Sequence, residues 1–214
     1  WFMPTPSADA FSVGSLFASW IHPGGAVALD GISGAVVVGG GMIGIKVAEA
    51  FAYLKLDTTV VELADRVLAL ALDDTGSTMA KRAMEQQGIR VITGSGVTSI
   101  GGSDGKVQSV TLDSGSRLPC QIVIMAVGVR PNTALAVQAG LAVNRGILVD
   151  DHMRTSDNDI YAAGDVAEAF DPLLGECRPI AIWPAAFMQG EVAAANMAGQ
   201  DETYDGSIPM NSIQ

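Results

Sequence analysis

The sequence predicts an α/β fold with a doubly wound parallel sheet, because three apolar strands alternate with two helical segments. Runs rich in β-branched residues predict buried strands at residues 35–39 (AVVVG), 58–62 (TTVVE) and 90–94 (RVITG). Helices are expected between them, over residues 42–56 and 74–87. The resulting β-α-β-α-β order is typical of a parallel sheet, in which each helix carries the chain back to the start of the next strand.

A small antiparallel β meander is expected next. The short alternating runs GVTSI, KVQSVTL and SRLPC are separated by the turn sequences GGSDG and DSGS. Alternation interrupted by turn residues at this spacing indicates strands connected by hairpins. Residues 121–128 (QIVIMAVG) then return to the pattern of a buried strand.

The remainder of the chain is expected to be mixed. It contains a loop and a short helix in RPNTALAVQAGL, a strand at residues 145–150 (RGILVD), and a short β-type run at residues 160–163 that leads into a Gly-Asp pair. Residues 171–179 are expected to form a loop. A helix with small residues on its packing face is expected over residues 183–199.

The composition indicates a globular protein of one or two domains. The chain has 214 residues, of which 49% are hydrophobic and 16% are charged, and this composition is that of a globular protein and far from that of a disordered one. Its net charge of −11 would repel polyanions, so we expect no nucleic-acid partner. No stretch approaches the ~18 consecutive apolar residues of a membrane span, so we expect no membrane partner either.

The cysteines and histidines indicate neither a metal centre nor a disulfide framework. Cys120 and Cys177 lie far apart without a CxxC pair, which fits reduced thiols in a cytoplasmic protein. His22 and His152 are isolated, and isolated histidines are more often surface side chains than catalytic groups. We therefore predict no metal site and assign no catalytic acid, base or nucleophile within the sequence.

The strongest functional signal is a GxGxxG fingerprint that directly follows a predicted strand and opens a predicted helix. In that setting the first glycine permits a tight turn, the second lets a diphosphate approach the backbone, and the third lets the helix pack close to the strand. The helix start offers free amides and a positive dipole end, so a Rossmann-like dinucleotide site is predicted. A purely structural glycine turn is the alternative. The predicted cofactor-binding residues of the fingerprint are Gly39, Gly40, Gly41, Met42, Ile43 and Gly44.

The acidic residue Glu62 predicts which dinucleotide is bound. It ends the second predicted strand about 20 residues past the fingerprint, where a carboxylate accepts hydrogen bonds from the adenosine ribose and repels a 2′-phosphate. NAD(H) is therefore favoured over NADP(H). Arg66, in the following loop, keeps the phosphorylated form open because a guanidinium binds phosphate. Alternatively, Glu62 is simply a solvated strand end.

Four motifs, in this order, resemble the pyridine nucleotide-disulfide oxidoreductase family. They are the fingerprint, GVRPN at residues 128–132, TSDNDIYAAGDVAE at residues 155–168, and WPAAFMQGEVAAANMAG from residue 183. The resemblance covers roughly residues 30–210. It is nearest to the branch of NADH oxidases, coenzyme A-disulfide reductases and nitrite reductase flavoproteins.

The resemblance implies an NAD-binding domain that is inserted into a split FAD-binding domain. Residues 1–26 would be a lead-in from the FAD-binding domain. Residues 27–145 would form the NAD-binding domain, and residues 146–214 an incomplete second half of the FAD-binding domain. The implied cofactors are therefore NAD(H) and FAD.

The resemblance also implies roles for residues outside the fingerprint. Asp165, which follows Gly164, would bind the ribitol of FAD. The helix that starts near Ala185 would place its positive end under the flavin ring, and Val127 with Gly128 would line the nicotinamide side of the NAD cleft.

The sequence departs from the family pattern in ways that change the expectation. It carries one glycine fingerprint where the family has two, and neither cysteine matches the family's redox cysteine. We therefore expect an internal fragment in which FAD is absent or weakly bound. Relatives commonly carry glutamate at the position of Lys46, so this lysine either alters hydride transfer or is a solvated helix residue.

The sequence thus predicts the NAD(H)-binding portion of an FAD-dependent NADH:acceptor oxidoreductase of the disulfide type. The intact flavoprotein would be an enzyme and a homodimer that passes electrons to an acceptor the sequence does not identify, whereas this chain alone would be inactive. A stand-alone NAD-binding module without catalytic activity is the alternative. A Rossmann-like domain that binds some other ligand is a third interpretation.

Overall fold

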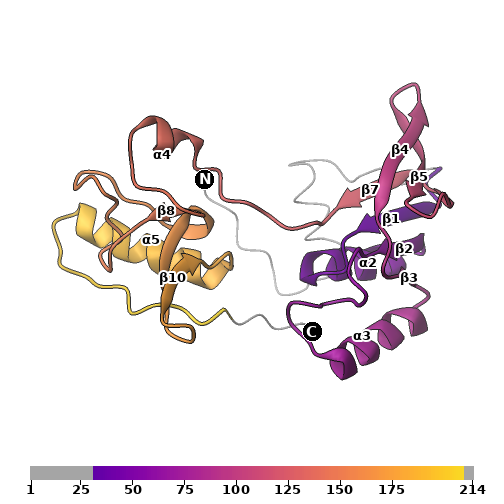
Figure 1. Cartoon of the computed structure of the whole chain (residues 1–214), viewed down its shortest axis with the longest axis horizontal. Coiled ribbons are helices and arrows are strands. Elements are labelled where there is room, and N and C mark those ends of the chain that lie inside the picture. Colours follow the sequence, from indigo (N-terminus) through magenta and orange to yellow (C-terminus); the bar gives the residue numbers. More distant parts are fainter. Residues whose placement is uncertain (1–30, 210–214) are drawn as a thin grey trace, which may run out of the picture. The chain divides into compact units, whose positions relative to one another are not determined.

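The computed structural model describes residues 31–209, which form two compact units (Figure 1). The first unit ends at Gly128 and the second begins at Val129. This division falls before residue 145, where the sequence placed the end of the NAD-binding domain. Contacts alone assign no ligand to either unit, so that domain boundary stays a prediction. The lead-in predicted for residues 1–26 lies outside the described residues.

A parallel sheet forms the centre of the first unit, as the sequence predicts. Its strands are β1 (Gly34–Val38), β2 (Asp57–Val61), β3 (Arg90–Ile92) and β7 (Ile122–Met125), in the order β3-β2-β1-β7. Each neighbouring pair is parallel. β1 is buried along its whole length because it has a neighbour on each side and cover on both faces, which explains its continuous apolar sequence.

Two helices, α2 (Met42–Tyr53) and α3 (Asp74–Gln86), cover one face of this sheet (Figure 1). Buried side chains of β1, α2 and α3 meet there in a single hydrophobic core. α2 stops before residue 56, where the sequence placed its end. The reason is local, because Lys55 has a φ of 63° and a right-handed helix cannot continue through that conformation.

The predicted antiparallel meander covers the opposite face. It consists of β4 (Val97–Ser103), β5 (Lys106–Leu112) and β6 (Arg117–Pro119), in the order β4-β5-β6. Val110 and Leu112 of β5 pack against the side chains of β1 and β2 that point away from the helices. Strands therefore provide the layer that helices would form in a doubly wound sheet.

The second unit contains a small mixed sheet and a long helix. Its strands are β8 (Ile147–Leu148), β9 (Ala167–Asp171) and β10 (Glu176–Pro179), in the order β10-β9-β8. β8 runs parallel to β9, and β10 runs antiparallel to it. The short predicted helix is α4 (Ala134–Gln138), and the long one is α5 (Trp183–Met197). Within residues 31–209, no helix combines the length and the apolar character needed to cross a bilayer.

Two predictions for the second unit are wrong, and a third is confirmed over a shorter span. The run at residues 160–163 forms no strand, whereas the strand predicted at residues 145–150 exists but has only two residues in its ladder. Residues 171–179, predicted as a loop, instead complete a hairpin. β propensity misleads at residues 160–163 because the backbone there bonds to a nearby turn, as in the 3.1 Å hydrogen bond from Ala162 N to Met153 O.

The hairpin of β9 and β10 is closed by the fully buried carboxylate of Asp171. Its Oδ1 accepts a hydrogen bond from Leu173 N at 2.9 Å, and its Oδ2 accepts one from Arg178 Nε at 2.7 Å. Gly175 supplies the positive φ of 68° that the turn requires. Burial acts to raise the pKa of Asp171, but Arg178 and the turn amides outweigh it and hold the pKa below its usual value.

We predict that Asp171→Asn destabilises the protein near neutral pH and that this difference narrows in acid. A carboxyl whose pKa is lowered by folding stabilises the fold above its unfolded pKa of 3.8, and that stabilisation is lost as the pH falls through the folded value. Urea unfolding of both proteins from neutral to acidic pH measures the difference. Asp104→Asn, on an exposed turn of the first unit, is the control. A difference that stays constant with pH would contradict the prediction.

Candidate dinucleotide-binding site

The loop from β1 to α2 places the three fingerprint glycines in different surroundings. Gly39 has a φ of 109°, and a Cβ there would overlap the carbonyl oxygen of Ala126, just beyond β7. A Cβ on Gly44 would overlap the carbonyl oxygen of Gly39. At Gly41, by contrast, no non-neighbouring atom lies within 4 Å of the position a Cβ would take. Packing therefore requires the first and third glycines, whereas the second leaves open space in front of the backbone.

α2 begins at this open position without a cap. Gly41 is the N-cap residue, no side chain bonds to the first amides, and the first turn contains no acidic residue. The first N–H groups of a helix have no acceptor within the helix, so those of Met42 and Ile43 are available to an anion. The positive end of the helix dipole adds to this preference. The start of α2 can therefore bind a diphosphate.

Glu62 follows β2 and turns its carboxylate toward the glycine loop. Its Oε2 accepts a hydrogen bond from Gly40 N, and its Oε1 accepts one from Ala64 N at 2.7 Å. The carboxylate is therefore fixed by two backbone amides rather than free in solvent. Each carboxylate oxygen accepts two hydrogen bonds, so both retain capacity for the hydroxyls of a ribose.

Arg66 lies in the same loop and is paired with two aspartates. Its Nη1 is 3.1 Å from Oδ1 of Asp65, and its Nε is 3.4 Å from Oδ1 of Asp74. The guanidinium that the sequence suggested for a 2′-phosphate is thus already matched by negative charge.

Exposed apolar side chains lie at the carboxyl ends of the parallel strands. Ile43 in the first turn of α2, Leu63 after β2 and Val127 after β7 have exposed fractions of 62%, 75% and 67%. Gly128 follows Val127 with a φ of 95°. Ligands of parallel sheets bind outside these strand ends. Sequence analysis missed Leu63, because a single leucine after an acidic residue becomes notable only once the strand ends are aligned.

Lys46, in the second turn of α2, is half-buried. Its Nζ pairs with Oε2 of Glu49 at 2.9 Å, one turn further along the helix. Both interpretations of Lys46, a solvated helix residue and a residue that alters hydride transfer, stay predictions.

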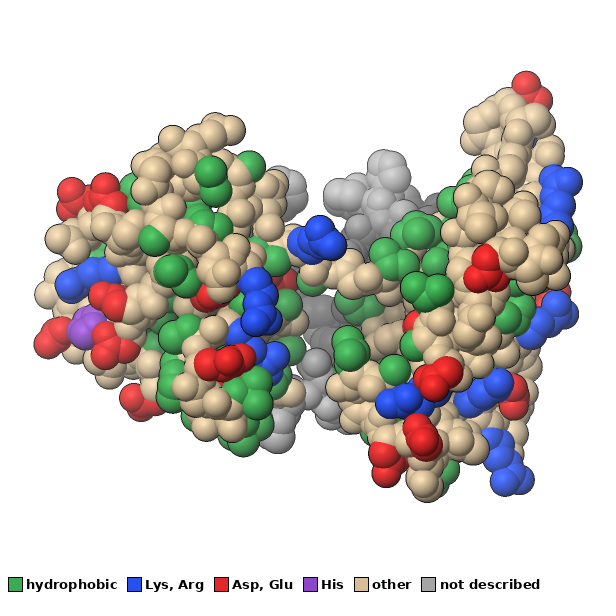
Figure 2. All heavy atoms as spheres, viewed as in Figure 1, with side chains coloured by type: hydrophobic (Ala, Val, Ile, Leu, Met, Phe, Trp, Pro, Cys, Tyr) green, Lys and Arg blue, Asp and Glu red, His purple; other side chains and the backbone are tan. Residues whose placement is uncertain are grey.

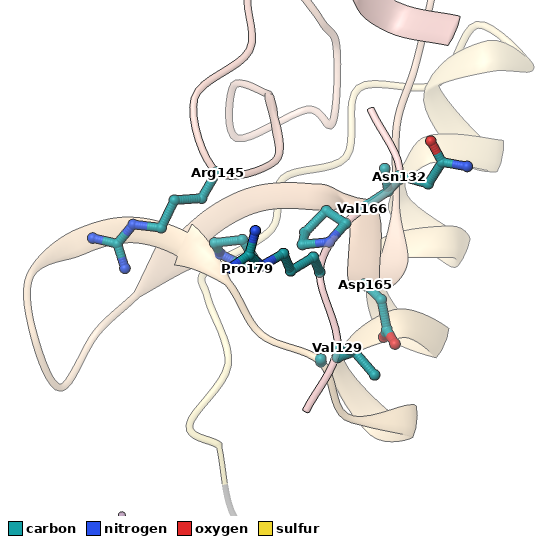
Figure 3. Close-up of a pocket in the computed structure, with 9 residues that line it drawn as sticks. Val129, Asn132, Arg145, Asp165, Val166 and Pro179 are labelled. Atoms are coloured by element: carbon teal, nitrogen blue, oxygen red, sulfur yellow. The ribbon is translucent and has the colours of Figure 1, made fainter. Parts of the chain in front are cut away.

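In the second unit, Asp165 lines a pocket of about 660 Å³ (Figure 3). Asp165 lies in the 3₁₀ turn η1 (Gly164–Val166), and its side chain is exposed. Figure 3 shows Arg145 on the opposite side of the pocket from Asp165. Residues 129–132 and the end of β10 complete the lining. The volume lies within the range of about 300–1,000 Å³ that small-molecule and cofactor sites occupy.

The fully buried side chain of Gln189 in α5 holds this turn in place. Its Oε1 accepts a hydrogen bond from Gly164 N at 2.7 Å, and its Nε2 lies 3.4 Å from the hydroxyl of Tyr204. Gly164 has a φ of 82°, which favours glycine. The sequence analysis missed Gln189, because a polar residue in an otherwise apolar helix does not reveal a partner far away in the chain.

The start of α5 shares two features with the start of α2. It lacks a side-chain cap, and its first turn contains no acidic residue. Ala185, in that turn, is fully buried, and Ala186 lies beside Gly164, where an added Cβ would be 3.5 Å from the Ala186 Cβ. Asp165 therefore lies next to the positive end of a long helix.

On the second unit, a histidine side chain lies among acidic side chains (Figure 2). His152 is close to the carboxylates of Asp150 and Asp151. Its Nδ1 is 2.7 Å from Oδ1 of Asp151, and its Nε2 is 2.9 Å from Oδ1 of Asp201. These two contacts raise the pKa of His152 and favour the imidazolium. The imidazole of His152 therefore connects Asp151 with Asp201, which lies after α5.

A parallel sheet with a glycine loop and an uncapped helix at its carboxyl edge is the fold of FAD- and NAD-binding oxidoreductases. The sequence profile described as "Pyridine nucleotide-disulphide oxidoreductase" matches residues 18–190. The chain therefore belongs to the pyridine nucleotide-disulphide oxidoreductase family.

Curated and solved relatives agree with this assignment. The chain is 33% identical to the assimilatory nitrate reductase electron transfer subunit of Bacillus subtilis (strain 168) over 181 residues. This match covers 84% of this chain and 23% of that protein. An FAD-dependent pyridine nucleotide-disulphide oxidoreductase from Desulfovibrio vulgaris is similar at 37% identity with a TM-score of 0.81, covering 91% of this chain and 48% of the other. An NAD-dependent persulfide reductase from A. fulgidus is similar at 35% identity with a TM-score of 0.79, covering 84% and 33%. The chain thus spans less than half the length of each relative.

We predict that Gln189→Met destabilises the protein by about 1–3 kcal/mol, because the buried N–H of Gly164 would lose its acceptor. Methionine has a similar volume, so the loss reports the hydrogen bond rather than a cavity. Thermal and urea unfolding measure the change. Gln200→Met, at an exposed position after α5, is the matched control. Equal stability of the two variants would rule out this role for Gln189.

Proposed function

We propose that this chain is the NAD(H)-binding portion of an FAD-dependent NADH:acceptor oxidoreductase. The observation that carries the proposal is the contrast among the fingerprint glycines, since Gly41 faces open space at the start of an uncapped helix while Gly39 and Gly44 are closed in by backbone. A purely structural glycine turn would need no such opening. The names of two relatives support the choice of cofactors, one being NAD-dependent and the other FAD-dependent.

In this proposal NAD(H) lies along the carboxyl edge of the first unit. The amides of Gly41, Met42 and Ile43 bind its diphosphate. The carboxylate of Glu62 accepts hydrogen bonds from the adenosine ribose. Val127 and Gly128, at the end of β7, line the nicotinamide side.

The second unit contributes to the flavin site in the same proposal. The carboxylate of Asp165 accepts a hydrogen bond from a ribitol hydroxyl, and the free amides at the start of α5, near Ala185, bring a positive dipole to the flavin ring. Bound FAD would supply the hydride-accepting chemistry, while these residues bind and orient it. Residues 146–214 then form the second half of the FAD-binding domain.

An NAD-binding module without turnover is the second candidate. Residues 31–209 contain one strand, glycine loop and helix of the kind that binds a diphosphate, and it lies in the first unit. FAD needs a second such loop for its own diphosphate, and this favours the module without turnover. Flavin absorbance of the purified chain and NADH-ferricyanide turnover, with and without added FAD, distinguish the two candidates. Turnover that appears with FAD supports the first, whereas NADH binding without turnover at saturating FAD supports the second.

We further infer that the intact enzyme is a cytoplasmic homodimer. The two cysteines support a reducing compartment because both are free, Cys120 buried and Cys177 exposed. Light scattering on the complete enzyme would test the oligomeric state.

We predict that Gly41→Ala and Gly44→Ala impair the protein for different reasons. Gly41 has a φ of −79° and open space around it, so alanine leaves the fold intact but obstructs the diphosphate, lowering NADH affinity by about tenfold or more. Gly44→Ala drives a methyl group into the backbone of Gly39 and lowers the free energy of unfolding by about 1–3 kcal/mol. Fluorescence titration with NADH and thermal unfolding measure the two effects.

Gly190→Ala is the matched control for both variants. It adds the same methyl group in open space on α5, so neither NADH affinity nor stability should fall. A Gly41→Ala protein that is folded and binds NADH with unchanged affinity would refute the proposed site.

We also predict that Glu62→Ala narrows the gap between NADH and NADPH affinity. Loss of the charged acceptor weakens the contact with the ribose of NADH by about 1.5–3 kcal/mol. The 2′-phosphate of NADPH is at the same time no longer repelled by a carboxylate. Parallel titrations with both nucleotides measure the ratio. Asp57→Ala, at the other end of β2, removes an equal charge as the control. An unchanged ratio would remove Glu62 from the ribose site.

A further inference from the structure

The loop that carries Arg66 folds back onto the glycine loop. Leu68 N donates to Gly40 O at 2.9 Å, and the carboxylate of Glu62 accepts from Gly40 N. A Cβ on Gly40 would lie 3.1 Å from Cγ1 of Val67. Both ends of the loop therefore flank the same glycine, and Arg66 immediately precedes Val67. A phosphate added to a ribose at Glu62 would meet the charges of this loop.

Those charges are mostly negative. The Arg66 side chain is 35% exposed, while the Asp65 and Asp74 carboxylates that contact it are 82% and 92% exposed. The guanidinium is thus partly buried, and both carboxylates reach it from solvent. Together with Glu62, three negative charges lie around one positive charge.

We propose that Asp65 and Asp74 are specificity-determining residues that make this site select NADH over NADPH; this inference rests on the function proposed above. An unpaired Arg66 would attract a 2′-phosphate, because a guanidinium binds phosphate oxygens. The two aspartates neutralise the charge of Arg66, and Asp65 also accepts a hydrogen bond from its Nη1, so the guanidinium attracts a 2′-phosphate less strongly. Both act through Arg66 and are positioning residues.

Asp74 can be altered while the side-chain cap of α3 is retained. The N-cap of that helix is Asp73, whose Oδ1 accepts a hydrogen bond from Gly76 N at 2.8 Å. The buried Nε of Arg66 has no hydrogen-bond acceptor, and Oδ1 of Asp74 forms an ion pair with it at 3.4 Å. Asp74→Asn therefore releases the guanidinium while the helix cap is retained.

Fluorescence titration of the full 214-residue chain with NADH and with NADPH tests this inference. Asp65→Asn and Asp74→Asn should each raise NADPH affinity about two- to fivefold, as expected for exposed charge pairs, and the double variant about tenfold. NADH affinity should change less than about twofold in all three variants, because none touches the ribose contact. Competition by 2′,5′-ADP against 5′-AMP should show the same change, since the two differ only in the ribose phosphate.

Two controls separate a local effect from net charge. Glu85→Gln removes one negative charge from the other end of α3, where Glu85 pairs with Lys81, and should leave NADPH affinity unchanged. Arg66→Ala combined with Asp74→Asn should abolish the gain, because the aspartate acts through the arginine. Thermal unfolding establishes that each variant is folded.

Unchanged NADPH affinity in the folded double variant would overturn this inference while NADH binding remained intact. An equal gain in Glu85→Gln, or a gain that survives Arg66→Ala, would also overturn it. Failure of the unaltered chain to bind NADH would instead overturn the proposed function, and this inference with it.

Discussion

The close backbone approach between Gly44 and Gly39 is the constraint on which the first unit depends. A side chain on Gly44 would occupy the position of the Gly39 carbonyl oxygen, so the first turn of α2 lies directly against the end of β1. Gly39 is fixed in turn, because its N–H donates to Val61 O at 2.8 Å and its own Cβ position is blocked by Ala126. The N-terminus of α2 is thereby fixed at the carboxyl end of β1, with its free amides next to the open space at Gly41.

The carboxylate of Glu62 fixes the glycine loop to the end of the neighbouring strand, β2. It accepts hydrogen bonds from Gly40 N and Ala64 N, so it connects the glycine loop to the loop after β2. That second loop is bonded to the one after β3, where Gly94 N donates to Ala64 O at 2.7 Å. Ordering these loops before a ligand arrives removes part of the entropic cost of binding. The acid that would recognise a ribose is thus also part of the scaffold.

The sequence predicts the first unit well because its signals are local. A buried strand, a glycine loop and a helix follow one another without interruption at residues 35–53. Its failures concern structure that depends on distant partners. β9 and β10 pair because Asp171 is buried against Arg178, and residues 160–163 bond to a turn instead of a sheet. The role of Gln189 cannot be predicted from the sequence for the same reason. Its side chain accepts a hydrogen bond only because the Gly164 turn lies beside α5.

Among the three long helices α2, α3 and α5, the distribution of acidic residues separates the two starts that can bind anions from the one that cannot. α3 has Asp73 as its cap and Asp74 in its first turn, so carboxylates already satisfy its amides and dipole. α2 and α5 have neither a side-chain cap nor an acid in the first turn, although the chain contains 23 acidic residues. Each of these two starts lies against a glycine with positive φ, Gly39 in one unit and Gly164 in the other. An uncapped helix start costs stability unless a ligand satisfies its amides. In the proposed function, the start of α2 would hold the diphosphate of NAD(H), and the start of α5 would lie at the flavin ring.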